Sequence, residues 1–189
     1  MIRPSYPLRT ARLDLRPFTA DDFAGLHAIH SDPDVVRYLH WHPLDEASTE
    51  VALARRTRRT TLIDAGDSLS LAVVERETGA LAGDATFFWR SEQSRQGEIG
   101  YVFNPAFHGR GYATETAEEL VRFGFEELGL HRVTGRLDGR NTASARVLER
   151  LGMRREAHLR QNELVKGEWA DEVVYGLLAD EWRARSDRT

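Results

Sequence analysis

The residues best suited to bind a ligand lie between Gly97 and Glu115, in the stretch GEIGYVFNPAFHGRGYATE. Residues Glu98 to Phe103 are mostly of β-favouring types, and Asn104-Pro105 ends this strand because proline has no N–H to donate. Gly109 and Gly111 follow, just before a helical pattern. Glycines in this position let a ligand approach the unpaired N–H groups at the positive end of a helix dipole. The stretch therefore predicts an anion site, and phosphate is the anion that matches it best.

Two other phosphate-binding motifs are excluded by the residues at fixed positions. No Gly-Lys-Ser/Thr follows the glycines, so the stretch is not a P-loop. Thr114 stands where the dinucleotide fingerprint G-x-G-x-x-G requires its third glycine. The phosphate site therefore belongs to another kind of strand–loop–helix corner.

The composition indicates a globular protein of one domain, residues 1–189, with a core from about residue 8 to about residue 180. Of the residues, 41% are hydrophobic and 30% are charged, and the net charge of −4 does not favour nucleic acid or membrane as a partner. The absence of cysteine excludes disulfides, cysteine nucleophiles and thiolate metal sites, and it fits a cytoplasmic location. The chain shows no signal peptide and no apolar run long enough to span a membrane.

Hydrophobic periodicity and turn residues predict seven strands and several helices. The expected strands are Arg12–Phe18, Ser68–Glu75, Ala80–Trp89, Glu98–Phe103, Arg132–Leu137, Arg154–Val165 and Asp171–Leu178. The expected helical segments are Thr19–His30, Val35–Leu39, Leu44–Ala65, Thr114–Leu128, Asn141–Leu151 and Asp180–Arg185. This order favours the α+β (mixed α/β) class, with a mostly antiparallel mixed sheet of about seven strands and helices on both faces.

The element order resembles the GNAT N-acetyltransferase superfamily almost end to end. The phosphate loop is similar to that family's Q/R-x-x-G-x-G/A motif, with His108 at the Q/R position, then Gly111 and Ala113. His108 is a departure from the motif, so the expected contacts there are those of the backbone. Tyr101-Val102-Phe103 resembles the strand whose backbone holds the pantetheine arm, and Asn141–Ser144 resembles the N-x-x-S helix start beside that arm.

Both ends of the chain look like one branch of this superfamily. Leu8–Pro17, and Lys166–Trp169 followed by Val173-Val174-Tyr175, are similar to the ribosomal-protein N-terminal acetyltransferases. The resemblance covers a large group whose acceptors vary. It therefore implies a primary amine as acceptor and leaves open whether that amine is a protein N-terminus or a small molecule.

The resemblance implies acetyl-CoA as cosubstrate, no metal, and direct attack of the amine in a ternary complex. Arg110 offers a positive charge for the pyrophosphate. Arg140, Arg146 and Arg150 are candidates for the nucleotide 3′-phosphate, with Arg146 preferred. The residues expected to bind acetyl-CoA are Tyr101, Val102, Phe103, His108, Gly109, Arg110, Gly111, Tyr112, Ala113, Thr114, Asn141, Ser144 and Arg146.

Catalysis requires that the amine is neutral and that the leaving thiolate is protonated or tolerated as an anion. Glu98, at the start of the cofactor strand, is the candidate general base, directly or through a water; its alternative role is to bind the charge of the acceptor or to face water. Asp84 is the second candidate. Many GNAT enzymes protonate the thiolate with a tyrosine, but Leu148 stands at that position. Ser144 is assigned either to the sulfur or pantetheine, or to capping the helix that Asn141 begins.

Fewer residues of the sequence can be assigned to binding the acceptor amine. Trp41 is either a wall of the acceptor site or an anchor in the core, and Asp84 and Glu98 are the expected substrate-binding acids. The histidines lack the supporting ligands that a metal site needs. Two alternative functions stay open, an aminoglycoside or polyamine N-acetyltransferase and a binding module that senses acyl-CoA without turnover. A homodimer also stays open.

The phosphate assignment leads to a first prediction. Replacing Gly111 with a bulky residue should weaken CoA binding, because a side chain there would keep the pyrophosphate from the backbone N–H groups. Titration calorimetry with CoA measures this affinity, and an unaltered affinity would move the phosphate site elsewhere.

Overall fold

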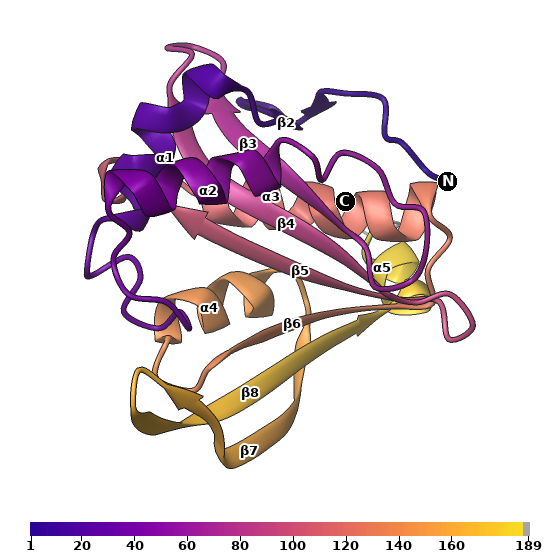
Figure 1. Ribbon diagram of the computed structural model, residues 1–189. Coiled ribbons are helices and arrows are strands. Elements are labelled where there is room, and N and C mark those ends of the chain that lie inside the picture. The colour runs from indigo at the N-terminus through magenta and orange to yellow at the C-terminus, as the bar shows by residue number, and fades with distance from the viewer. Residues whose placement is uncertain (187–189) are drawn as a thin grey trace.

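The protein's structure, a computed structural model, describes residues 1–186 and is built on one eight-stranded sheet (Figure 1). Its strand order is β1-β2-β3-β4-β5-β6-β8-β7, and every neighbouring pair is antiparallel except β5 and β6. The strands are β1 (Leu8–Arg9), β2 (Leu13–Pro17), β3 (Ser68–Glu75), β4 (Leu81–Ser91), β5 (Gln96–Phe103), β6 (Arg132–Asp138), β7 (Arg154–Val165) and β8 (Glu168–Leu178).

Helices cover both faces of this sheet. Helices α1 and α2 pack on one face against β3 and β4, while α3 and α4 contact each other and lie against β5 and β6. The helical elements are η1 (Ala20–Asp22), α1 (Phe23–His30), α2 (Glu46–Arg56), η2 (Pro105–Phe107), α3 (Tyr112–Arg122), the π-helical turn η3 (Phe123–Glu127), α4 (Thr142–Arg150) and α5 (Ala179–Ser186). The predicted mixed α/β class, with a mostly antiparallel sheet between helices, is confirmed.

The structure corrects three of the predicted elements. The short strand β1 is the eighth strand, paired with β2. The helix predicted to run to residue 65 ends at Arg56, because Leu62 leaves the helical path, is fully buried and pairs with Ile2. The segment Val35–Leu39 forms turns rather than a helix, with Val36 as its one buried anchor.

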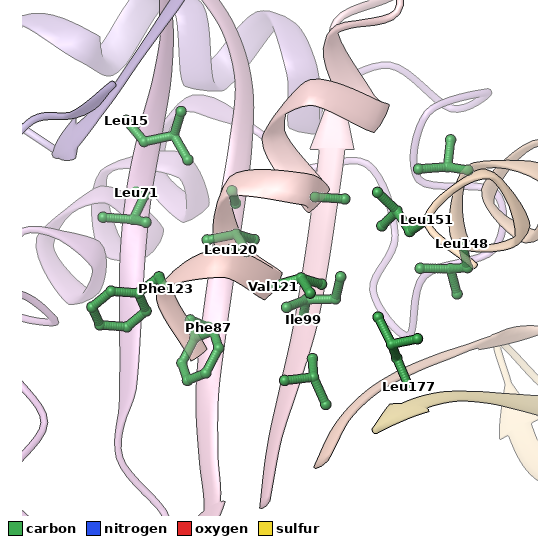
Figure 2. Close-up of a cluster of buried hydrophobic side chains, with 14 of the residues drawn as sticks. Leu15, Leu71, Phe87, Ile99, Leu120, Val121, Phe123, Leu148, Leu151 and Leu177 are labelled. Atoms are coloured by element: carbon green, nitrogen blue, oxygen red, sulfur yellow. The ribbon is translucent and has the colours of Figure 1, made fainter. Parts of the chain in front are cut away.

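The main core lies between the sheet and α3, α4 and α5. Leu120, Val121 and Phe123 point from the helical segment toward side chains of the strands (Figure 2). Phe87 and Phe123 meet edge to face with ring centroids 5.3 Å apart. Gly97 lies under this cluster, and a Cβ there would come within 2.8 Å of the Phe87 ring. The close packing explains why the second residue of β5 is a glycine, which has no side chain.

Strands β5 and β6 run side by side for only part of their length. They pair in parallel from Gln96 with Arg132 to Ile99 with Gly135, and no pairing continues beyond Ile99. Strand β6 stays paired with β8 as far as Asp138, and Gly100 to Phe103 stay paired with β4. The two strands diverge toward α4 in Figure 1. One edge of β5 therefore presents backbone N–H and C=O groups that no strand satisfies.

The packing of Phe123 leads to a second prediction. Phe123→Ala should lower the free energy of unfolding by about 3–5 kcal/mol, because it removes a fully buried ring and leaves a cavity against Phe87. Urea denaturation measures the change. Val51, which is 54% exposed, supplies the control: Val51→Ala should change stability by less than about 0.5 kcal/mol. Equal effects of the two substitutions would contradict this account of the core.

Candidate active site

Two hollows meet at the opening between β5 and β6. One, of about 700 Å³, is bordered by the loop before α3, by α3 and by α4. The other, of about 420 Å³, lies between the 31–45 segment, strands β4 to β6 and the β7–β8 hairpin. Six residues line both hollows: Tyr38, Leu39, Tyr101, Val102, Asn141 and Ser144. A molecule that extends from one hollow into the other passes between these residues.

The larger hollow ends at the predicted phosphate corner. Gly109 and Gly111 have φ angles of 75° and 82°, and Gly111 is the N-cap of α3. The first N–H groups of the helix have no intrahelical acceptor and face this corner. The Thr114 hydroxyl, in the first turn, is buried without a hydrogen-bond partner among residues 1–186. Unpaired donors at a positive helix end fit the pyrophosphate of acetyl-CoA.

Side chains around this corner hold the loop in shape. The His108 ring donates from Nε2 to the carbonyl oxygen of Phe103, 3.2 Å away, so it ties the loop to the end of β5. Arg110 points away from the hollow, and its guanidinium lies 3.1 Å from the Glu75 carboxylate. The expected cation at the pyrophosphate is therefore engaged elsewhere in this structure.

Arg12 reaches the same corner from the N-terminal part of the chain. Its guanidinium makes two bonds to Glu115, at 2.8 and 2.6 Å, and lies over the Tyr112 ring. Burial alone would raise the pKa of Glu115, but its bonds to Thr10 and Arg12 lower it overall. The sequence analysis missed Arg12, because no local pattern links it to a helix about a hundred residues later.

The open edge of β5 faces the N-terminus of α4. The Tyr101 hydroxyl donates to the Ser144 carbonyl oxygen at 3.3 Å, and burial raises the pKa of Tyr101, which keeps the phenol protonated. Asn141 accepts from the Ser144 N–H at 3.1 Å, which is a helix cap. Leu148 is almost fully buried against Gly135, so the expected tyrosine position is apolar.

All of the residues predicted to bind acetyl-CoA border the larger hollow, except Arg110. Arg146 is exposed on α4 and lines it together with Arg150. Arg140 does not line it, because Asp138 binds its guanidinium at 2.7 and 2.9 Å. Tyr101, Val102, Phe103, His108, Gly109, Gly111, Tyr112, Ala113, Thr114, Asn141, Ser144 and Arg146 all lie on its walls.

The smaller hollow has the sheet as its floor. Side chains alternate along a strand, so one face of β4 presents Asp84, Thr86, Phe88 and Arg90 to it. On β5 the residues opposite these are Val102, Gly100 and Glu98. Gly100 has no side chain, so the backbone is open at the middle of the floor. Glu98 stands at one end of this surface and Asp84 at the other.

Glu98 is held by Arg90. The guanidinium donates to both carboxylate oxygens, at 3.0 and 2.8 Å, and it also lies over the Phe88 ring. The Glu98 side chain is 12% exposed, within the hollow. A fixed carboxylate therefore lies beside the point where β5 and β6 separate.

Asp84 belongs to a buried cluster that the sequence analysis did not foresee. Its Oδ2 accepts from Arg56 at 2.7 Å and lies 2.9 Å from the Nε2 of His30. Burial alone would raise the pKa of Asp84, but Arg56 and His30 outweigh burial and lower it. Asp84 Oδ1 and His30 Nδ1 have no partner among residues 1–186. Arg56 lies in a basic stretch of α2 in which no single arginine stands out.

Two segments form the side walls of the smaller hollow. Tyr38 and Trp41 come from the 31–45 segment, and Trp41 is 36% exposed with its ring 5.7 Å from that of His30. The opposite wall is the β7–β8 hairpin. Lys166, at the tip of the hairpin, donates from Nζ to the Val36 carbonyl oxygen at 2.7 Å and so joins the two walls. Trp41 thus borders the hollow and also packs on a buried side chain.

Comparison with known proteins identifies the family of this chain. The family model described as "Acetyltransferase (GNAT) domain" matches residues 12–154. The chain is similar to an uncharacterized N-acetyltransferase of Bacillus subtilis, YnaD, with 30% identity over 93% of this chain and 98% of the relative. It is also similar to a putative ribosomal N-acetyltransferase of that organism, YdaF, with 36% identity over 55% of this chain and 57% of the relative.

A crystal structure of a GNAT-family acetyltransferase from Bacillus anthracis is similar over 92% of this chain and 98% of that one, with a TM-score of 0.82 and 30% identity. Within residues 1–186, no helix meets the length and apolarity needed to cross a membrane. The family model, the relatives and the solved structure indicate the same family. The chain belongs to the GNAT acetyltransferase family, whose acetyl donor is acetyl-CoA, and it is an N-acetyltransferase.

Proposed function

We propose that the protein transfers the acetyl group of acetyl-CoA to a small primary amine that carries a second positive charge. The amine attacks the thioester directly in a ternary complex. Acetyl-CoA occupies the larger hollow and the acceptor occupies the smaller one. The observation that carries this proposal is the charge of the smaller hollow.

Carboxylates outnumber guanidinium groups on the walls of the smaller hollow. Arg56, Arg90 and Arg136 are the lining arginines. The lining carboxylates are Asp84, Glu98, Asp138, Glu163, Asp171 and Glu172. This excess of negative charge attracts cations and disfavours anions.

Glu163 is the carboxylate that makes this charge available to a ligand. Arg136 binds Glu172 through two bonds of 2.7 Å, and Arg140 binds Asp138 from outside the hollow. The Glu163 carboxylate has no ion pair or hydrogen bond among residues 1–186, although Arg136 lies within electrostatic reach, and the side chain is half-buried in the wall. A second ammonium group of the acceptor would find its partner here.

The shape of the hollow supports a small acceptor. Its volume of about 420 Å³ lies within the usual range for small-molecule sites. The bond from Lys166 to Val36 bridges its two side walls, which narrows the entrance. A folded protein cannot enter such a space, and only a flexible N-terminus could reach the thioester.

Glu98 is the proposed general base. Its carboxylate takes the proton that the amine nitrogen loses on forming the amide, directly or through a water. Arg90 fixes the orientation of this carboxylate by binding both oxygens. The open backbone of β5 and the cap at Asn141 position the thioester, so the two reactants are held together. Ser144 and Asn141 contribute to this side of the site.

A protein N-terminus is the second candidate acceptor. Leu164 and Trp169 are neighbours across the β7–β8 hairpin and are 56% and 62% exposed. They lie on the hairpin that forms one wall of the hollow. A peptide with its first residue in the hollow could place the following residues on this apolar pair, as the partial likeness to YdaF also favours.

The third prediction concerns the acceptor. In a thiol-release assay, a linear diamine should be a better acceptor than the monoamine of equal length and than peptides with a free N-terminus. Glu163→Gln should raise KM for the diamine about tenfold, which corresponds to about 1.4 kcal/mol, and leave KM for the monoamine and for acetyl-CoA unchanged. Glu77→Gln, which removes an exposed carboxylate from the β3–β4 turn, is the matched control. Better turnover of peptides would assign the site to a protein N-terminus.

The fourth prediction concerns the base. Glu98→Gln should lower kcat/KM at neutral pH by about 10² to 10⁴. Activity should recover as the pH approaches the value at which the free amine loses its own proton, so the acidic limb of the profile shifts upward. Glu92→Gln, in the exposed β4–β5 turn, should leave the profile in place. An unchanged acidic limb in the Glu98 variant would remove Glu98 as the base.

A further inference from the structure

We infer that Tyr38 is the general acid that protonates the leaving thiolate. The reaction breaks the carbon–sulfur bond of the thioester, and the sulfur needs a proton to leave as a thiol. The position to which the family resemblance assigns a tyrosine for this step holds Leu148, buried at 2% exposure against Gly135. The proton must therefore come from another element.

The location of the departing sulfur narrows the choice. The pyrophosphate corner lies next to the Phe103 end of β5, and the open edge of that strand leads back toward Ile99. A thioester that follows this edge arrives where the two hollows join. Among the six residues that line both hollows, the side-chain hydroxyls are those of Tyr38, Tyr101 and Ser144.

The hydrogen bonds distinguish the tyrosines. Of the five in the chain, four have hydroxyls that donate to a fixed acceptor within the protein. Tyr101 donates to the Ser144 carbonyl oxygen, so its proton is already engaged. The Tyr38 hydroxyl has no hydrogen-bond partner among residues 1–186, although its ring is half-buried at the junction. It is the tyrosine with a proton available for a ligand.

The chemistry of the donor separates Tyr38 from Ser144. Phenols ionise near pH 10 and thiols near about pH 8.5, so a phenol gives a proton to a thiolate at modest cost. An aliphatic alcohol is a far weaker acid and cannot do so. Ser144 is therefore suited to hydrogen bonding, and Tyr38 to proton transfer.

Two guanidinium groups lie close to the Tyr38 ring. Arg37 is 5.5 Å and Arg140 5.9 Å from its centroid. Asp138 holds Arg140 in place through two bonds. These positive charges stabilise the ring as it takes on negative charge on giving up the proton. The bond from Lys166 to Val36, two residues before Tyr38, keeps the segment at the junction.

Two protons are transferred as the acetyl group moves from sulfur to nitrogen. The acceptor nitrogen forms a bond to the acetyl carbon, and the carbon–sulfur bond breaks with its electron pair on sulfur. Tyr38 gives its hydroxyl proton to the sulfur, and Glu98 takes the proton released by the nitrogen. Solvent then moves one proton from Glu98 to Tyr38, which restores both residues.

The test compares Tyr38→Phe with the unaltered chain, using acetyl-CoA and the best amine of the acceptor assay. The substitution removes the proton donor and keeps the ring, so kcat should fall about 10²-fold while KM for acetyl-CoA stays within threefold. Tyr6→Phe removes a half-buried hydroxyl that is bonded to the Thr60 carbonyl oxygen and lines neither hollow, so it should leave kcat unchanged. A kcat within threefold for Tyr38→Phe would overturn the inference.

A second measurement separates proton transfer from packing. Fluorinated tyrosines of increasing acidity at position 38 keep the shape of the ring, and they should move the basic limb of the kcat profile to lower pH in the order of their acidity. A basic limb that stays in place would overturn the assignment even if Tyr38→Phe is slow. The inference rests on the proposed direct attack, but the two fail separately: Glu98 governs the acidic limb, and Tyr38 the basic one.

Discussion

The separation of β5 from β6 after Ile99 is the constraint on which the rest of the site depends. Backbone N–H and C=O groups in a sheet normally pair with a neighbouring strand, but Gly100 to Phe103 have no paired strand on the β6 side. Leu148 packs on Gly135 and the Tyr101 hydroxyl reaches the Ser144 carbonyl, so α4 occupies the space that would let the strands close. The same opening provides an edge for an extended ligand and joins the two hollows. An acetyl donor and an acceptor can therefore meet from opposite faces of one sheet.

Arginine–carboxylate pairs give the smaller hollow its shape. Asp84 with Arg56, Glu98 with Arg90 and Glu172 with Arg136 are joined by bonds of 2.7 to 3.0 Å. Desolvation offsets much of the attraction in such pairs, so they contribute little net stability. Their larger effect is to hold long side chains in one orientation. The cavity is thereby lined with fixed charges, and a ligand need not order them on binding.

Local signals in the chain were sufficient for most of the fold and for the glycine-containing loop before α3. Gly109 and Gly111 lie directly before α3 as predicted, and Asn141 caps α4 as its type predicts. The predicted helix through residue 65 was wrong, because burial of Leu62 against the N-terminal segment outweighs local helical preference. Arg110 was expected at the pyrophosphate, but Glu75 of a distant strand binds it instead.

By itself, the sequence determined the order of the elements, the glycine corner and the family resemblance, because each depends on residues that are close along the chain. The tertiary structure decided which side chains line the smaller hollow and which contacts hold its walls together. His30 and Asp84 lie 54 positions apart, and Lys166 and Val36 lie 130 apart. No periodicity encodes such pairs, since they form only when separate elements pack. Tyr38 shows the difference most clearly: in the sequence it is one tyrosine in a predicted helical turn, and in the folded chain it borders both hollows at their junction.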